Sequence, residues 1–266
     1  MRSRTLGGCH ATYSQAAHPL SNERPLLYIN LGAVNLGTTA YYATLAHEFN
    51  HFLQFLAHPH QETWVNEGLA ELAADLSGYA PFSRDDFLTN PDTQLTAWAE
   101  SAQVGPHYGA AYLFFKYFAA HYARGGALGE LLRQKEDGAV GIDAFLVAKG
   151  YQLSFDDIFS DWAVANLLDE AGDGPHSYPD ATVRARITDD LRAPTRRSGT
   201  VHQYAARYLE LRASSGEAQL SFSGAITTTL MPEAPRSGQY FYWSNRGDSI
   251  DTTLTRQFDL SGLSRA

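Results

Sequence analysis

Large apolar side chains recur at helical spacing over the first two thirds of the chain. Residues 40–57 carry one set of them, and this spacing predicts a helix: Leu45, Phe49, Phe52, Leu53 and Leu56. Pro59 ends this segment, because proline cannot continue a helix. Further helices are predicted over 63–77, 106–123, 127–135, 141–149 and 154–170, with N-terminal capping signatures at Ser83 and Ser154.

Strand-like patterns lie at both ends of the chain. An apolar run rich in strand formers covers residues 25–34, and from about residue 200 segments such as "QLSFSG" alternate between apolar and polar positions. We expect an α+β protein: a mainly helical domain over 1–190 with an N-terminal strand region, followed by a β-rich unit over 191–266. A complete β-sandwich needs about 100 residues, so this unit is expected to be a partial, truncated sandwich. Residues 1–190 are expected to fold without it.

The composition excludes some classes of partner. Of the 266 residues 44% are hydrophobic and 18% charged, and the formal net charge is −9. Nucleic-acid surfaces need clustered Lys and Arg, so no nucleic-acid partner is expected. No apolar run is long enough for a membrane span. Cys9 is the single cysteine, which precludes an intrachain disulfide, and the first residues lack the apolar region of a signal peptide.

The stretch "TLAHEFNHFLQF" at 44–55 carries candidate chemistry. His47 and His51 stand four apart, so on a helix both imidazoles project from one face and could bind one Zn²⁺. Glu48 lies beside that face, where a carboxylate could accept a proton from a metal-activated water. The alternative is a core helix whose two histidines have ordinary hydrogen-bond partners.

A third ligand candidate follows in "ETWVNEGLAELAAD" at 62–75. Glu67 and Glu71 are again four apart and share a helix face. A catalytic zinc needs three protein ligands, and a ligating histidine needs an acceptor for its other ring N–H. We expect Glu67 to bind the metal and Glu71 to orient a histidine. Either glutamate alone could instead lie on a solvated helix face.

The two motifs together resemble those of the gluzincin metallopeptidases. Residues 25–170 look most like the hyicolysin-type neutral metallopeptidases and the related immune inhibitor A group, and the tail resembles the β-domain that follows in such proteins. The resemblance implies a zincin-like fold, a zinc-dependent endopeptidase acting on protein or peptide substrates, and secretion by a bacterium. By motif, His47, His51 and Glu67 match the metal ligands and Glu48 the general base. Glu71 matches the acid that orients a histidine, although thermolysin's longer spacing would favour Glu71 as the ligand.

A zinc peptidase also needs a donor for the oxyanion of the tetrahedral intermediate. "GPHYGAAY" offers Tyr108 as the first choice and His107 as the second, both at the start of a helix. Alternatively, Tyr108 simply belongs to a packing stripe with Tyr112 and Phe115.

Two other functions fit the same residues. The chain could be a catalytically silent surface or binding protein that kept the zincin fold, or a zinc exopeptidase on the same scaffold. The presence of both histidines, Glu48 and Glu67 favours a catalyst over the silent protein. The tripeptide at 246–248, Arg-Gly-Asp, is interpreted as a turn.

Overall fold

The computed structural model describes residues 7–8 (backbone only), 26–79, 81, 83–99, 103–192, 195–212 and 219–224. The chain divides into two compact units, Met1–Ser221 and Phe222–Ala266, and only 222–224 of the second are described. Cys9, the tripeptide at 246–248 and the strands predicted beyond residue 224 lie outside the described residues.

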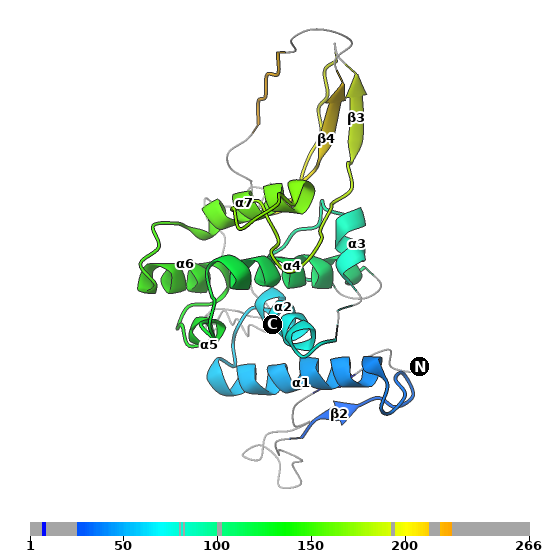
Figure 1. Cartoon of the computed structure of the whole chain (residues 1–266), viewed down its shortest axis with the longest axis vertical. Helices are drawn as coiled ribbons and strands as arrows, with labels where there is room; N and C mark the ends of the chain where they lie inside the picture. The colour runs from blue at the N-terminus through cyan, green and yellow to red at the C-terminus, as the bar shows by residue number, and fades with distance from the viewer. Residues whose placement is uncertain are drawn as a thin grey trace, which may run out of the picture. The chain divides into compact units, whose positions relative to one another are not determined.

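The described part of the first unit is mainly helical, as predicted (Figure 1). Its helices are α1 Thr39–Ala57, α2 Thr63–Leu76, α3 Arg84–Thr89, α4 Gly105–His121, α5 Leu128–Leu131, α6 Gly138–Ala148 and α7 Phe155–Leu168. The predicted helices are confirmed to within a few residues at most ends, except that α5 is a single turn. The cap at Ser154 forms a full capping box with Asp157, whereas Ser83 makes no side-chain cap.

The described strands are short and form two separate pairs. β1 (Gly7–Gly8) pairs antiparallel with β2 (Tyr28–Ile29), which is the strand formed within the described residues 26–34 of the predicted strand region at 25–34. β3 (Asp189–Arg192) pairs in parallel with β4 (Leu209–Arg212). Residues 219–224 form no ladder, and Leu220 and Phe222 are 78% and 90% exposed. The described residues therefore show no β-sandwich.

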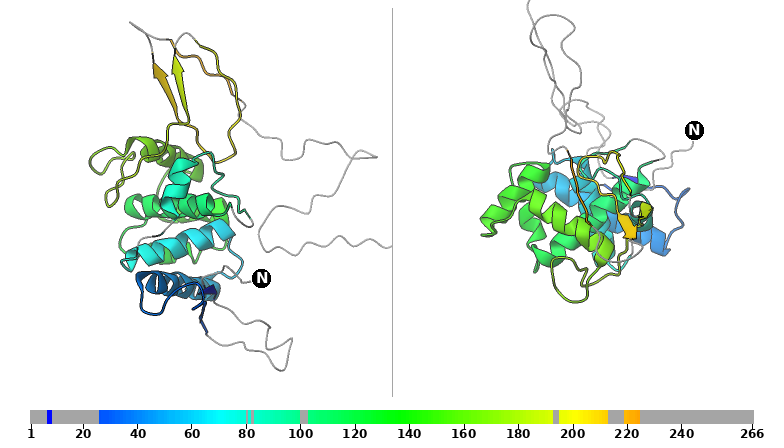
Figure 2. Two further views of the ribbon diagram at one scale, coloured as in Figure 1. Left: turned by 90° about the vertical axis from the view of Figure 1, so that its right-hand side faces the viewer. Right: turned by 90° about the horizontal axis from the view of Figure 1, so that it is seen from above.

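Helix α4 forms the centre of the core. Its residues 109–115 and 117–118 are all buried, so most of its surface is covered by other elements. In Figures 1 and 2, α1, α2, α4 and α7 follow one another as successive layers. Trp64 on α2 stacks on Phe115, and Phe114 meets Trp162 of α7 edge to face. Among the described helices none is long and apolar enough to cross a bilayer.

Residues 204–208 pack onto this helical core. The Leu95 N–H donates to the carbonyl of Tyr204 over 2.9 Å, and the Ala206 N–H donates to that of Pro91 over 3.2 Å. Tyr208 is buried, and its hydroxyl donates to the Ala163 carbonyl over 2.7 Å. The first compact unit thus continues past residue 190.

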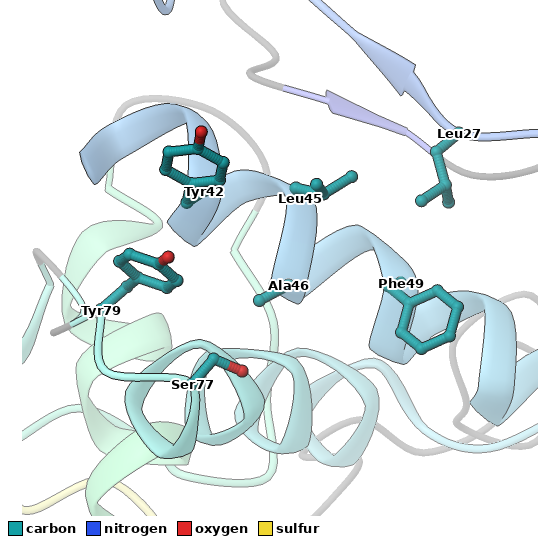
Figure 3. A pocket seen from close by; sticks show the side chains of 7 residues that line it. All are labelled: Leu27, Tyr42, Leu45, Ala46, Phe49, Ser77 and Tyr79. Atoms are coloured by element: carbon teal, nitrogen blue, oxygen red, sulfur yellow. The ribbon is translucent and has the colours of Figure 1, made fainter. Parts of the chain in front are cut away.

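The apolar stripe of α1 does not face the core. The predicted helix is confirmed, but Phe49, Leu53 and Leu56 on it are 49%, 44% and 66% exposed. The buried face of α1 instead carries Ala43, Thr44, Glu48 and Gln54, and it contacts α2. This leaves an open apolar groove of about 400 Å³ on the other side of α1 (Figure 3), lined by Leu27, Tyr42, Leu45, Ala46, Phe49, Ser77 and Tyr79.

Candidate metal centre

Three of the predicted ligands converge between α1 and α2. The Nε2 atoms of His47 and His51 lie 2.9 Å apart. Glu67 Oε2 lies 3.2 Å from the first and 3.4 Å from the second. On a helical wheel these histidines are roughly opposite the apolar groove, so this groove and the candidate metal centre are on different sides of α1. His47, His51 and Glu67 form the one metal-type cluster of His, Cys, Asp and Glu in the described part of the chain.

The spacing of the three atoms fits a tetrahedral ion. Ligand atoms about 2.1 Å from Zn²⁺ lie about 3.4 Å from one another in tetrahedral geometry, and the three observed separations are 2.9–3.4 Å. Glu67 Oε2 is buried, and no described residue gives it an aligned hydrogen bond. The imidazoles of His47 and His51 lie close to this oxygen, but neither directs an N–H at it. A buried carboxylate oxygen in this position fits a cation better than it fits an apolar core.

Glu71 pairs with Nδ1, the other ring nitrogen of His47. Its Oε1 lies 2.9 Å from His47 Nδ1, so an Nδ1–H donating to the carboxylate leaves the Nε2 lone pair facing His51 and Glu67. The four side chains keep 14–19% of their surface exposed, so the cluster is reachable from solvent. The geometry thus favours Glu67 as the ligand and Glu71 as the group that orients His47.

The neighbouring acids favour the protonated form of His47, which must lose its Nε2 proton before that atom can bind a metal. Burial lowers the pKa of His47, but its contacts with Glu67 and Glu71 outweigh burial and raise that pKa to about 10. Burial likewise raises the pKa of Glu67, yet the contacts with His47 and His51 lower it to about 2. Both directions have one cause: closely spaced imidazoles and carboxylates attract each other strongly where little water reaches them.

The proposed base and oxyanion donor lie beside the cluster. Glu48 is 7% exposed and follows His47 on α1. Tyr108, at the start of α4, lies near the carboxylates of Glu67 and Glu48, and its ring centroid is 6.3 Å from that of His47. Burial, followed by the charge of Glu67, raises the pKa of Tyr108 above its ordinary value. The phenol therefore keeps its proton at neutral pH and is available as a donor.

His107 lies against residues 94–98 and away from the metal-type cluster. Its pKa is lowered, mainly by burial, and its ring interacts with the backbone of Gln94 and Ala97. Trp98 lies between the two candidates, with its ring centroid 6.0 Å from that of His107 and 4.8 Å from that of Tyr108. Of the two predicted donors, Tyr108 is the one in contact with the metal-type cluster. The helical periodicity of the sequence did not predict that Trp98 would pack against Tyr108.

A distant segment fixes the turn between the two metal helices. His58 contacts the Gln134 carbonyl through Nδ1 over 2.8 Å and the Asp137 carboxylate through Nε2 over 2.6 Å. Gln61 Oε1 accepts the N–H of Gly138 over 2.7 Å. These contacts tie residues 58–61 to the start of α6 and so set the angle at which α2 leaves α1. Nothing in the sequence links positions so far apart.

No protein-family model matches the chain, and no curated protein matches it. The resemblance to gluzincins therefore stays a prediction carried by the motif residues, and the geometry of His47, His51 and Glu67 stands independently of it.

Proposed function

We propose that this protein is a zinc-dependent endopeptidase. The observation that carries the proposal is the convergence of His47 Nε2, His51 Nε2 and Glu67 Oε2 to within 3.4 Å of one another, with the Glu48 carboxylate on the adjoining position of the same helix. Two imidazoles and a carboxylate are a ligand set of catalytic zinc sites, where the fourth position is left to water or substrate. Bound Zn²⁺ would polarise a peptide carbonyl and lower the pKa of a coordinated water.

The side chains around the cluster have complementary tasks. The Glu48 carboxylate accepts the proton of the attacking water and passes it to the leaving amine. Tyr108, which remains protonated, donates a hydrogen bond to the developing oxyanion. Glu71 keeps His47 in the tautomer whose Nε2 faces the ligand cluster.

The test combines metal analysis with hydrolysis of casein and of an end-blocked fluorogenic peptide. Wild type should bind about one zinc per chain and cleave both substrates. Glu48→Gln should keep its zinc and lose about 10²–10⁴-fold in kcat, because the water loses its proton acceptor. His51→Ala should lose both zinc and activity. Glu130→Gln, an exposed carboxylate paired with Lys149, is the matched control and should behave as wild type.

Each alternative function has its own outcome. Zinc binding by wild type without cleavage would support a silent binding protein. Release of single terminal residues, with the end-blocked peptide left intact, would support an exopeptidase. Near-normal hydrolysis by Glu48→Gln would reject the role given to that carboxylate.

A further inference from the structure

Polar side chains continue beyond the candidate metal centre along the contact between α2 and α4. On each helix three of them stand four residues apart, so they share one face. We call this set the polar seam: Glu67, Glu71 and Asp75 on α2, and Tyr108, Tyr112 and Lys116 on α4.

Two carboxylates of the polar seam meet partners on α4 in the same order along both helices. Tyr108 lies next to the Glu67 carboxylate, and its ring centroid is 6.3 Å from that of His47. Eight residues further along each helix, Lys116 Nζ lies 2.6 Å from Asp75 Oδ2. Tyr112, between the two contacts, lies near Asp75, and Lys116 Nζ lies 5.9 Å from the centroid of its ring. The Asp75–Lys116 ion pair is thus two turns from the metal ligand Glu67 on a rigid element.

The ion pair is placed where it can fix the register of the helices. The side chains of Lys116 and Asp75 are only 16% and 20% exposed, so removing one partner would leave the other charge largely shielded from water, which is costly. Between the two contacts Gly68 lies against the backbone of Ala111. A slip of one helix by one turn, about 5.4 Å, would break the Tyr108 and Lys116 contacts together.

We propose that Lys116 is a positioning residue of the metal centre. Its ion pair with Asp75 holds α2 in the register on α4 that places Glu67 between the two histidines and against Tyr108. This inference rests on the proposed function insofar as Glu67 is a metal ligand there. Lys116 itself contacts neither the metal-type cluster nor, in this assignment, the substrate.

The test measures metal binding by the full chain and needs no activity. Zinc affinity is measured by competition with a chromogenic chelator, and the Co²⁺-substituted protein reports coordination geometry through its visible absorption bands. Lys116→Met keeps most of the side-chain stem and removes the charge. It should weaken zinc binding about 10-fold, as loss of outer supporting contacts does, and alter the Co²⁺ bands. Lys116→Arg should restore most of the affinity.

The chain offers a closely matched control in Lys149. Its Nζ lies 2.7 Å from Glu130 Oε2 and 5.8 Å from the centroid of the Phe145 ring, so the local contacts resemble those of Lys116, but they lie between α5 and α6. Lys149→Met should leave zinc affinity and the Co²⁺ spectrum unchanged. An equal loss in Lys149→Met would mean general destabilisation and would overturn the inference.

A double variant distinguishes a loss of helix register from the effect of leaving one charge unpaired. Asp75→Asn with Lys116→Met removes both charges, so no unpaired carboxylate remains in the polar seam, and the weakened affinity should persist. Recovery of wild-type affinity in the double variant would overturn the positioning role, as would an unchanged Lys116→Met. A wild-type chain that binds no zinc would instead reject the proposed metal centre, and this inference with it.

Discussion

Replacing Gly68 by alanine tests how closely α2 and α4 must approach. Gly68 follows the ligand Glu67 on α2. A Cβ added there would lie 2.6 Å from Phe115 Cδ2, 2.8 Å from the Ala111 carbonyl oxygen and 2.9 Å from the Ala111 carbonyl carbon. The phenylalanine ring can rotate, but the backbone of Ala111 cannot, so the two helices would have to move apart.

Two opposing free-energy contributions determine how much Gly68→Ala changes the stability of the fold. Alanine is favoured over glycine inside a helix by about 1 kcal/mol. Inserting a methyl group into a close-packed contact costs about 1–3 kcal/mol, and we take the upper end because two of the three short contacts involve backbone atoms. The net loss is about 2 kcal/mol, which for a unit of this size lowers Tm by about 4–8 °C.

The assay is thermal unfolding followed by circular dichroism, with zinc affinity measured on the same preparation. Gly68→Ala should unfold earlier and bind zinc more weakly, because Glu67 moves with α2. The control is Gly129→Ala on α5, where no described atom lies within 4 Å of the added Cβ. That variant should keep or raise Tm. A Gly68→Ala protein as stable as wild type would refute the claim that the close helix contact requires glycine.

Two further predictions concern the third ligand and the extent of the fold. Glu71→Gln should weaken zinc binding about 10–100-fold without abolishing it, whereas Glu67→Gln should abolish it. Isothermal titration would reveal the reverse order if the two roles were exchanged. A chain ended after residue 190 should be less stable than one ended after Ser221 by at least about 3 kcal/mol, because loss of a buried aromatic such as Tyr208 costs that much. Equal denaturation midpoints would contradict this.

The local features of this protein follow from the order of its residues. Helical periodicity located α1, α2, α4, α6 and α7, and the Ser154–Asp157 capping box marked the start of α7. The pairing of His47 with His51 needs only the i, i+4 geometry of one helix. The sequence therefore determined the metal-type histidine pair before any packing was known.

Packing between helices decided the remaining features. The approach of Glu67 to both histidines, with Glu71 on the other ring nitrogen, depends on how α2 is rotated against α1. That rotation is fixed by contacts as distant as His58 with Asp137. The approach of Tyr108 to Glu67 depends likewise on the register of α4.

The orientation of α1 shows why the sequence does not predict such contacts between helices. The spacing of its apolar residues located the helix, yet the face that is buried carries Glu48 and Gln54 and meets α2. A hydrophobic pattern reports the average preference of side chains for burial. It does not report which polar groups find partners on another helix, as Gln54 does with the Asn66 carbonyl on α2. Partners of this kind come together only when the tertiary structure forms, because they belong to different helices with no fixed spacing between them.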